Sequence, residues 1–571
     1  MAKLWTRSWQ AIWKEATRSK QMSHIIGIDF GSTNTTVAYA DNDEIIVIPD
    51  GNGNESFPSI VSIKNDGEFL VGRDAQKRLL LHPEETFFGI KRLLGLKPGD
   101  YVTENHPEII CKDGIVCIKS NNNTYSPELI ASAILKKAKE IAENYLNEEI
   151  YEAIVTIPAY FNVSQRHAIK KAGEMAGLKI KRFINGSTAA AVTYGTLARD
   201  TRKIYQKESV ITDGMLRSER VVLKDKKIEI DGKIMVIDFG GGTLDVSILE
   251  VGDGVCDVLS TCGNKMLGGE DFDAAIAKHI ISDIAEKYGR CLQNNSSTRR
   301  RILEAAKMAK EDLSSSKTVE INIPYLLKTR NGLSDYNGTL SQENLKVIVA
   351  DLLNKVRELI EQAITDASIT NKKSIDRVVL VGGMARMSII RELIKEYFGK
   401  DINPNTAVAM GAAILGGVLA GDFKNVLLLD VTPLSFGVEM KDGIVSPLIK
   451  RNSTIPTSVT ETFTTTDKNS TNIKIHIVQG ESSNAQDSES VGYITIDDLN
   501  PKLIEEQKIE VTFLVDSDGV LKVSAENKST HRKVSIIADG DIETIQKVEY
   551  TDDYKRAGEP SDGKKHWWNR K

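Results

Sequence analysis

The chain has 571 residues, of which 41% are hydrophobic and 27% are charged, and its formal net charge is −5. This ordinary globular balance excludes a collagen, a disordered polymer and a small disulfide scaffold, and the length predicts about three or four domains. Because there is no whole-chain basic field, we expect no nucleic acid among the partners. All five tryptophans lie near the ends of the chain, as Trp5, Trp9, Trp13, Trp567 and Trp568.

Cysteine usage and hydropathy bear on the cellular compartment of the protein. The five cysteines form no C-x-x-C pair, so we expect buried or inert thiols in a reducing environment. The longest nearly apolar run, residues 407–421, is too short and too rich in glycine to span a bilayer. Charges interrupt the apolar N-terminal stretch, which argues against a secretory signal. These features predict a cytoplasmic protein.

The first internal signal is a duplication. An apolar strand followed by Asp-Phe-Gly and small or hydroxyl residues occurs at 25–34 and again at 235–243. A second β-rich stretch follows each copy, at 35–39 and 246–251, so each predicts a hairpin with backbone N–H groups at its tip. A single Asp-Phe-Gly turn is weak evidence and is more often purely structural. Two copies with the same flanks indicate two homologous lobes that face each other across a cleft.

Helical patterns separate these turns from a third glycine turn, Gly382-Gly383, which lies between an apolar strand and a helix. A strand, a glycine turn and a helix N-terminus in this order commonly bind an anion or a nucleotide. The alternation of strands and helices over about 400 residues predicts a large α/β unit. The expected helices cover residues 127–146, 164–176, 272–288, 298–313 and 342–367.

Two further segments depart from this pattern. Residues 228–235 predict a hairpin with an Asp-Gly turn, and the charged stretch before them predicts a solvated loop, with partner binding as the alternative. After the apolar run 426–429, residues alternate with a period of two, which predicts a separate all-β sandwich at 431–540. About thirty residues remain after Asp541, too few for a helical domain.

Seven motifs in this order resemble the DnaK-type 70-kDa heat-shock chaperone family over about residues 24–545. They are the Asp29 turn, residues 88–95 and 157–162, the Asp238 turn, and residues 267–273, 381–383 and 426–435. The resemblance implies an actin-like, two-lobed α/β ATPase domain, an apolar linker and a β-sandwich that binds extended peptides. A helical lid normally follows the sandwich, and we expect none here.

The implied domains are a basic Trp-rich extension at 1–23, a nucleotide-binding domain at 24–424, a linker at 425–430, a sandwich at 431–540 and a tail at 541–571. Within the nucleotide-binding domain, residues of about 196–233 form an insertion relative to the family.

ATP or ADP and Mg²⁺ are the cofactors that the resemblance implies. Two hairpins would clasp the phosphates, with residues Gly31, Ser32, Thr33 and Asn34 in the first and Gly240, Gly241, Gly242 and Thr243 in the second. Asp29 and Asp238 would hold the metal through water, and Lys91, Thr243 and Asp245 join them as the implied catalytic set. The remaining implied nucleotide contacts are Gly268, Gly269, Glu270, Lys310, Ser314, Gly382, Gly383 and Arg386.

Two departures from the family pattern affect the expected activity. Gly186 stands where the family has a glutamate that helps to organise the water shell of the metal, and Lys307 replaces an acidic residue that meets the ribose. Loss of an outer carboxylate of this kind lowers metal affinity or activity roughly 10- to 100-fold. We therefore expect ATP binding with slow hydrolysis. The alternative is a pseudo-ATPase, a nucleotide-stabilised interaction module or co-chaperone that does not cycle. A sugar kinase of the same superfamily fits poorly, because it would need an acceptor pocket instead of the linker and sandwich.

The resemblance also implies a peptide-binding site and a set of residues for its allosteric control by the nucleotide. Val438, Phe463, Ile473 and Ile475 match the family's hydrophobic pocket, although for any one of them alone ordinary sandwich core would be the favoured alternative. Lys441 and Thr466 replace the residues that arch over the peptide, which predicts fast exchange. The residues implied in allosteric control are Pro158, Arg166, Leu427, Leu428, Leu429 and Asp430.

The expected partners are unfolded peptides, a J-domain co-chaperone and a nucleotide exchange factor. At about 100° per residue, the three N-terminal tryptophans fall on one face of a helix and basic residues fall on the other. Residues 564–571 are again basic and aromatic. This pattern is typical of an interfacial membrane helix, so peripheral membrane contact is one hypothesis and packing against the protein or a partner is the alternative.

Overall fold

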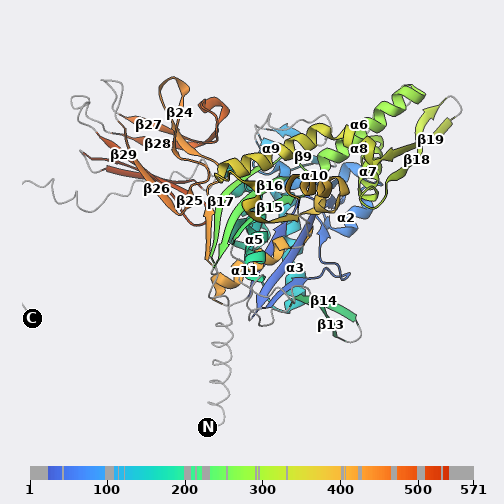
Figure 1. Cartoon of the computed structure of the whole chain (residues 1–571), viewed down its shortest axis with the longest axis horizontal. Helices are drawn as coiled ribbons and strands as arrows, with labels where there is room; N and C mark the ends of the chain where they lie inside the picture. Colours follow the sequence, from blue (N-terminus) through green and yellow to red (C-terminus); the bar gives the residue numbers. More distant parts are fainter. Residues whose placement is uncertain are drawn as a thin grey trace, which may run out of the picture. The chain divides into compact units, whose positions relative to one another are not determined.

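The computed structural model divides the chain into two compact units, Met1–Pro433 and Leu434–Lys571, which are described separately (Figure 1). The residues that the structure describes are 24–41, 44–96, 109–112, 115–120, 123–197, 207–212, 215–221, 232–252, 255–289, 292, 296–329, 332–399, 404–405, 407–421, 427–463, 472–497, 508–528 and 532–538. Both tryptophan-containing ends lie outside these residues. The hypothesis of peripheral membrane contact, which concerns those ends, therefore stays a prediction. Within the described residues, no helix is both long enough and apolar enough to cross a bilayer.

The first lobe of the larger unit is built on a mixed sheet with strand order β12-β11-β1-β2-β3-β14-β13. Strand β1 runs parallel to β11 and antiparallel to β2, and short β4 pairs with β2. The strands are β1 (Ile25–Phe30), β2 (Asn34–Asp41), β3 (Glu44–Ile48), β4 (Phe57–Pro58), β11 (Glu152–Ile157), β12 (Lys179–Asn185), β13 (Lys207–Thr212) and β14 (Met215–Val221).

The second lobe repeats this topology with the strand order β21-β20-β15-β16-β17-β22. Here β15 runs parallel to β20 and antiparallel to β16, as β1 does with β11 and β2. The strands are β15 (Gly232–Phe239), β16 (Leu244–Gly252), β17 (Val255–Asn264), β20 (Ile375–Val381), β21 (Pro404–Asn405) and β22 (Leu427–Val431). The two duplicated hairpins thus sit at equivalent places in two sheets, which confirms the predicted pair of lobes.

Two helices rich in small residues, α5 (Gly186–Leu197) and α11 (Ala407–Ala420), join the lobes through one shared core. This core takes residues from β2, β3, β15 and β20 as well as from both helices. A Cβ atom at Gly411 would overlap the backbone of Ala189, so the two helices approach closely only because this position is glycine. The apolar run 407–421 is therefore an internal helix.

The longer predicted helices are confirmed with small shifts at their ends. Ser126 caps α3 by accepting a hydrogen bond from the Leu129 N–H, and Asn162 caps α4 in a capping box with Gln165. The single helix expected over 342–367 is two, because the backbone leaves helical geometry at the fully buried Val349. The helices are α3 (Pro127–Leu146), α4 (Val163–Met175), α6 (Gly269–Tyr288), α7 (Ser296–Asp312), α8 (Gln342–Ile348), α9 (Ala350–Asp366) and α10 (Ser388–Phe398).

Smaller elements complete the lobes. They are α2 (Arg73–Arg78), the sheet of β5 (Val61–Ile63), β6 (Phe69–Val71) and β7 (Thr86–Phe87), the sheet of β8 (Ile109–Lys112), β9 (Ile115–Ser120) and β10 (Asn123–Tyr125), the hairpin of β18 (Thr318–Thr329) and β19 (Gly332–Ser341), and the 3₁₀ turns η2 (Ile90–Leu93) and η5 (Gly383–Arg386). Cys256 and Cys262 are buried, whereas Cys111 in β8 is exposed, so for Cys111 only the expectation of an inert thiol remains.

The prediction for the inserted segment was wrong. The charged stretch expected to be a loop contains β13 and β14, which pair with each other and extend the first sheet beyond β3 (Figure 1). Residues 232–235, expected in a separate hairpin, form the start of the central strand β15, and residues 222–231 lie outside the described residues. Alternating charge gave no sign of these strands, because the hairpin joins the sheet through the pairing of β14 with β3, which is far away in the chain.

The smaller unit is a sandwich of two antiparallel four-stranded sheets, ordered β24-β23-β27-β28 and β26-β29-β30-β31. The predicted alternation is confirmed in β29, where Val511, Phe513 and Val515 are fully buried. The strands are β23 (Phe436–Glu439), β24 (Val445–Ile449), β26 (Thr457–Phe463), β27 (Ile473–Gln479), β28 (Glu489–Ile496), β29 (Ile509–Val515), β30 (Leu521–Asn527) and β31 (Arg532–Ala538).

Candidate functional site

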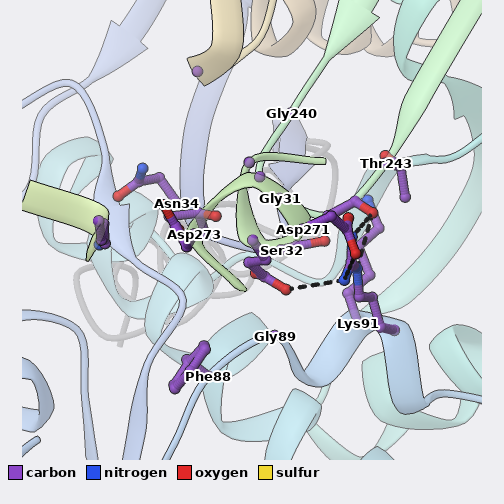
Figure 2. A pocket seen from close by; sticks show the side chains of 18 of the residues that line it. Gly31, Ser32, Asn34, Phe88, Gly89, Lys91, Gly240, Thr243, Asp271 and Asp273 are labelled. Carbon is purple, nitrogen blue, oxygen red and sulfur yellow. Dashed lines mark hydrogen bonds and ion pairs between the residues drawn. The ribbon is translucent and has the colours of Figure 1, made fainter. Parts of the chain in front are cut away.

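A cavity of about 2600 Å³ lies between the two lobes of the larger unit. The tips of both duplicated hairpins line it, the first with Gly31, Ser32, Thr33 and Asn34 and the second with Gly240, Gly241, Gly242 and Thr243 (Figure 2). The tips lie so close together that a Cβ atom at Gly241 would overlap the Thr33 hydroxyl and one at Gly242 would overlap that of Ser32. Such glycine tips expose backbone N–H groups, which favour bound phosphate.

Three carboxylates and one lysine lie beneath the hairpins. Asp29 is in β1, and Asp238 in β15 stands directly opposite Asp245 in β16. Asp29 Oδ1 accepts a hydrogen bond of 2.7 Å from Thr156 Oγ1, and Asp245 Oδ1 accepts one of 3.0 Å from the Ala159 N–H. Lys91, in η2, lines the same cavity and is 7% exposed.

Burial and the charges of the neighbouring groups shift the pKa values of these three carboxylates and the lysine. Burial, followed by the charge of the neighbouring Asp29, raises the pKa of Asp238 to about 7, against the opposing charge of Lys91. Burial and the charge of Asp238 raise the pKa of Asp245 to about 8. The pKa of Asp29 is also raised by burial, and burial lowers the pKa of Lys91 against the attraction of all three carboxylates. A buried site in which three carboxylates outnumber one ammonium favours the binding of a further cation.

The donor set fits Mg²⁺ held through water. Among the described residues, no group of three or more His, Cys, Asp or Glu side chains could ligate a metal directly. Mg²⁺ takes oxygen ligands and usually keeps several waters, so separated carboxylates around a roomy cavity suit it. Asp29 and Asp238 would hold these waters.

Gly186, the first residue of α5, leaves space that Asp238 takes. A Cβ atom at Gly186 would overlap Asp238 Oδ2, and Gly186 itself lines the cavity. The site therefore lacks the glutamate carboxylate that the resemblance implies at position 186. The Asp238 carboxylate occupies part of the space that a side chain at this position would take.

Arg92 is a site residue that the sequence analysis missed. Its side chain is 9% exposed and crosses from the first lobe to the second, where Nε donates to the Gly242 carbonyl at 2.9 Å. Nη2 donates to Asp271 Oδ2 at 2.6 Å, and Nη1 lies 3.5 Å from Glu270 Oε2. Its place directly after Lys91 in a matched motif was the signal available in the sequence.

Residues of α6, α7 and η5 also line the cavity, and the start of α6 adjoins the second hairpin, since the Glu270 N–H donates to the Gly241 carbonyl at 2.8 Å. Lys310 of α7 pairs with Asp273 of α6 at 2.7 Å, and its Nζ donates to the Gly269 carbonyl at 3.0 Å. Gly268 does not line the cavity, because it packs against the backbone of Gly241 behind the wall. The remaining implied contacts also line the cavity: Gly269, Glu270, Lys310, Ser314, Gly382, Gly383 and Arg386.

Most of the segment expected to be a linker lies in strand β22, which pairs in parallel with β17, from Leu427 opposite Val255 to Leu429 opposite Asp257. Leu428 packs against the shared core, whereas Leu427 is 53% exposed. Asp430 is buried, and burial raises its pKa, although the Val431 N–H and the charges of Arg182 and Arg166 oppose the shift.

A chain of contacts leads from the carboxylates toward this linker. Pro158 lines the cavity and precedes Ala159, the donor to Asp245. Arg166 Nε donates to the Phe161 carbonyl at 3.2 Å. Burial lowers the pKa of Arg166 to about 10, while the charge of Asp430 raises it.

The residues assigned to the peptide site lie on both sheets of the sandwich. Val438 in β23 and Ile475 in β27 are buried, and Ile473 in β27 is half-buried. Phe463, also half-buried, ends β26 in the other sheet. Lys441 is exposed just after β23, and Thr466 lies outside the described residues.

Two duplicated sheets that hold glycine hairpins over buried carboxylates define an actin-like, nucleotide-binding class of protein. The chain belongs to the Hsp70 family, since the family model described as Hsp70 protein matches residues 25–559. Proteins of this family are ATP-binding chaperones that use Mg²⁺ and bind unfolded peptides and co-chaperones.

Proposed function

We propose that this chain is an ATP-gated chaperone that binds extended peptide segments, hydrolyses ATP slowly and exchanges peptide fast. The observation that carries the proposal is the convergence of Lys91, Asp29, Asp238 and Asp245 beneath two glycine hairpins in one cavity. Backbone N–H groups of both hairpins would bind the phosphates. A bound Mg²⁺ would neutralise phosphate charge and so favour the transfer.

The residues of the chain have separate roles in this scheme. Lys91 supplies the ammonium near the reacting phosphate, and Thr243 lines the same cavity. Arg92 holds the first lobe against Gly242 and Asp271 of the second, which keeps the phosphate-binding tips together. Gly186 contributes no carboxylate to the water shell, and for this reason we expect slow hydrolysis.

Single-turnover ATP hydrolysis by the natural chain and by Gly186→Glu and Gly186→Ala tests this role. Both variants add a Cβ atom that displaces Asp238, so alanine controls for the steric effect and glutamate adds the carboxylate. We expect hydrolysis about 10- to 100-fold faster in the glutamate variant than in the alanine variant. Equal rates in the two variants would overturn this role. A natural chain that binds ADP but never hydrolyses ATP would favour the alternative, a pseudo-ATPase interaction module.

Fast peptide exchange is the second part of the proposal. Lys441 places an exposed ammonium at the position that the resemblance assigns to the arch over the peptide, where it weakens an apolar clasp. We expect Lys441→Met to slow the release of a labelled apolar peptide about 3- to 10-fold, because affinity changes are expressed mostly in the dissociation rate. Lys450→Met, on an exposed residue after β24, is the control. Unchanged release in the Lys441 variant, or a residence time of many minutes in the natural chain with ADP, would contradict fast exchange.

A further inference from the structure

A hydrogen-bonded row of three side chains crosses one sheet of the smaller unit. His476 of β27 stands between Glu439 of β23 and Ser490 of β28. Its Nδ1 lies 2.6 Å from Glu439 Oε2, and its Nε2 lies 2.8 Å from Ser490 Oγ. A serine, a histidine and a carboxylate in this order form the arrangement that activates a serine nucleophile.

A β-bulge in β28 brings the serine to the histidine. His476 pairs with Tyr493, whereas Val478 pairs with Ser490, so β28 has one residue more than β27 between these two pairs. In an unbroken strand, Ser490 and Tyr493 would point to opposite faces, because side chains alternate. The extra residue reverses this alternation and puts Ser490 on the face of His476. Bulges often re-aim a side chain in this way beside active sites.

The hydrogen bonds assign a role to each nitrogen of the imidazole. An ionised carboxylate can only accept, so the Nδ1–H of His476 donates to Glu439. In the neutral ring, Nε2 then has a lone pair, and the Ser490 hydroxyl donates to it. The histidine is therefore in the tautomer that can take the proton of the serine.

Neighbouring side chains hold the imidazole in place. The Tyr493 ring stacks on it, with the centroids 4.3 Å apart and the planes at 12°, and Lys474 Nζ lies 3.9 Å from the centroid of the tyrosine. The His476 side chain is 13% exposed, while Ser490 is half-buried and can be reached from solvent. A base fixed by packing beside a reachable hydroxyl is the preorganisation that nucleophilic catalysis requires.

We propose that Ser490 is a nucleophilic site that accepts an acyl group from an activated ester, with His476 as the general base and Glu439 as a positioning residue. The serine oxygen bonds to the carbonyl carbon while Nε2 takes the hydroxyl proton. The bond from that carbon to the leaving oxygen then breaks, and His476 returns the proton to this oxygen. The products are an O-acylserine and an alcohol. Water activated by the same imidazole then cleaves the new ester and releases the acid.

The test uses the full chain with two probes, p-nitrophenyl acetate and a tagged fluorophosphonate. In the second reaction, the serine oxygen bonds to phosphorus, fluoride leaves and His476 takes the proton. We expect each probe to modify Ser490, as located by mass spectrometry of the digested chain. Because thiols and amines also react with the ester, labelling by the fluorophosphonate decides the result. Modification of the natural chain only at other residues would overturn the proposal, and this measurement needs no variant.

Two pairs of variants test the roles. Ser490→Ala should lose the fluorophosphonate label, and Ser483→Ala, on an exposed serine of the same unit, should keep it. Glu439→Gln should be labelled about 100-fold more slowly, because an amide can donate to Nδ1 and leave the proton on Nε2, where it blocks the base. Asp487→Asn removes the same charge at an exposed position and should react as the natural chain does.

Thermal unfolding of each variant separates a change of reactivity from a change of fold. A purely structural row of hydrogen bonds would alter the unfolding temperature in Glu439→Gln without changing the labelling of Ser490. Natural labelling in a folded Glu439→Gln chain, or an undiminished label in Ser490→Ala, would show that the row does not activate the serine.

Discussion

At the residue scale, the site depends on a few side chains whose neighbours come from the opposite lobe. Arg92 is the clearest case, since it contacts Gly242 and Asp271 about 150 and 179 positions away in the chain. Its guanidinium fork makes both contacts at once. A lysine at this position has one ammonium on a flexible stem and cannot reproduce that geometry.

The Arg92→Lys variant should therefore bind ADP about tenfold more weakly, a loss of about 1.4 kcal/mol, while its unfolding temperature changes little. Isothermal titration with ADP and Mg²⁺, together with thermal unfolding without nucleotide, checks this. Arg357→Lys, on the exposed face of α9, serves as the control. Unchanged ADP affinity in Arg92→Lys would show that the contact between the lobes does not support the nucleotide site.

The sequence identified the chemistry of this site, but it did not reveal how neighbouring residues adjust. Lys91 and the three carboxylates were expected from the matched motifs, and all four line the cavity. That Asp238 takes the room left at Gly186 depends on χ angles and on the packing of α5 against β15. Sequence spacing contains no information about either.

At the scale of elements, the hairpins, helices and sandwich strands were predicted because their patterns are local. A buried strand, a glycine turn and an amphipathic helix each show their period within a dozen residues. The hairpin β13–β14 was missed because its place is set by pairing with β3. Its strands therefore became visible only in the folded sheet.

Deleting residues 200–228 removes this hairpin and exposes the edge of β3. We expect the free energy of unfolding to fall by about 1–3 kcal/mol, since a few backbone hydrogen bonds at roughly 1 kcal/mol each are lost. ADP affinity should stay within about twofold, because the hairpin joins the sheet through β3, and residues 45–48 of that strand do not line the cavity. Chemical denaturation and nucleotide titration measure the two quantities. A large loss of ADP affinity in a folded variant would indicate that the hairpin supports the site.

At the scale of the whole molecule, strand β22 is the element through which we expect the proposed nucleotide site to control the proposed peptide site of the sandwich. Its pairing with β17 spans only Leu427 to Leu429, and Leu428 and Asp430 add the burial of their side chains. A strand whose pairing is this short is suited to docking and release.

Replacing Leu428 and Leu429 together by aspartate should abolish any change in ATP turnover on addition of an unfolded peptide, because charged side chains cannot dock against the shared core. The exposed Leu427 gives a matched control, and Leu427→Asp should keep the response. Steady-state turnover with and without saturating peptide provides the measurement. A peptide response that persists in the double variant would show that coupling does not use β22.

By itself, the sequence determined the local elements, the duplicated turns and the motifs of an Hsp70-family chaperone. These features are encoded in short segments whose periodicity and turn chemistry need no distant partner. The tertiary structure alone decided that Arg92 joins the lobes, that Asp238 occupies the room beside Gly186, and that the insertion extends the first sheet. Each of these depends on contact between residues far apart in the chain, and such contacts arise only when the sheets and helices pack.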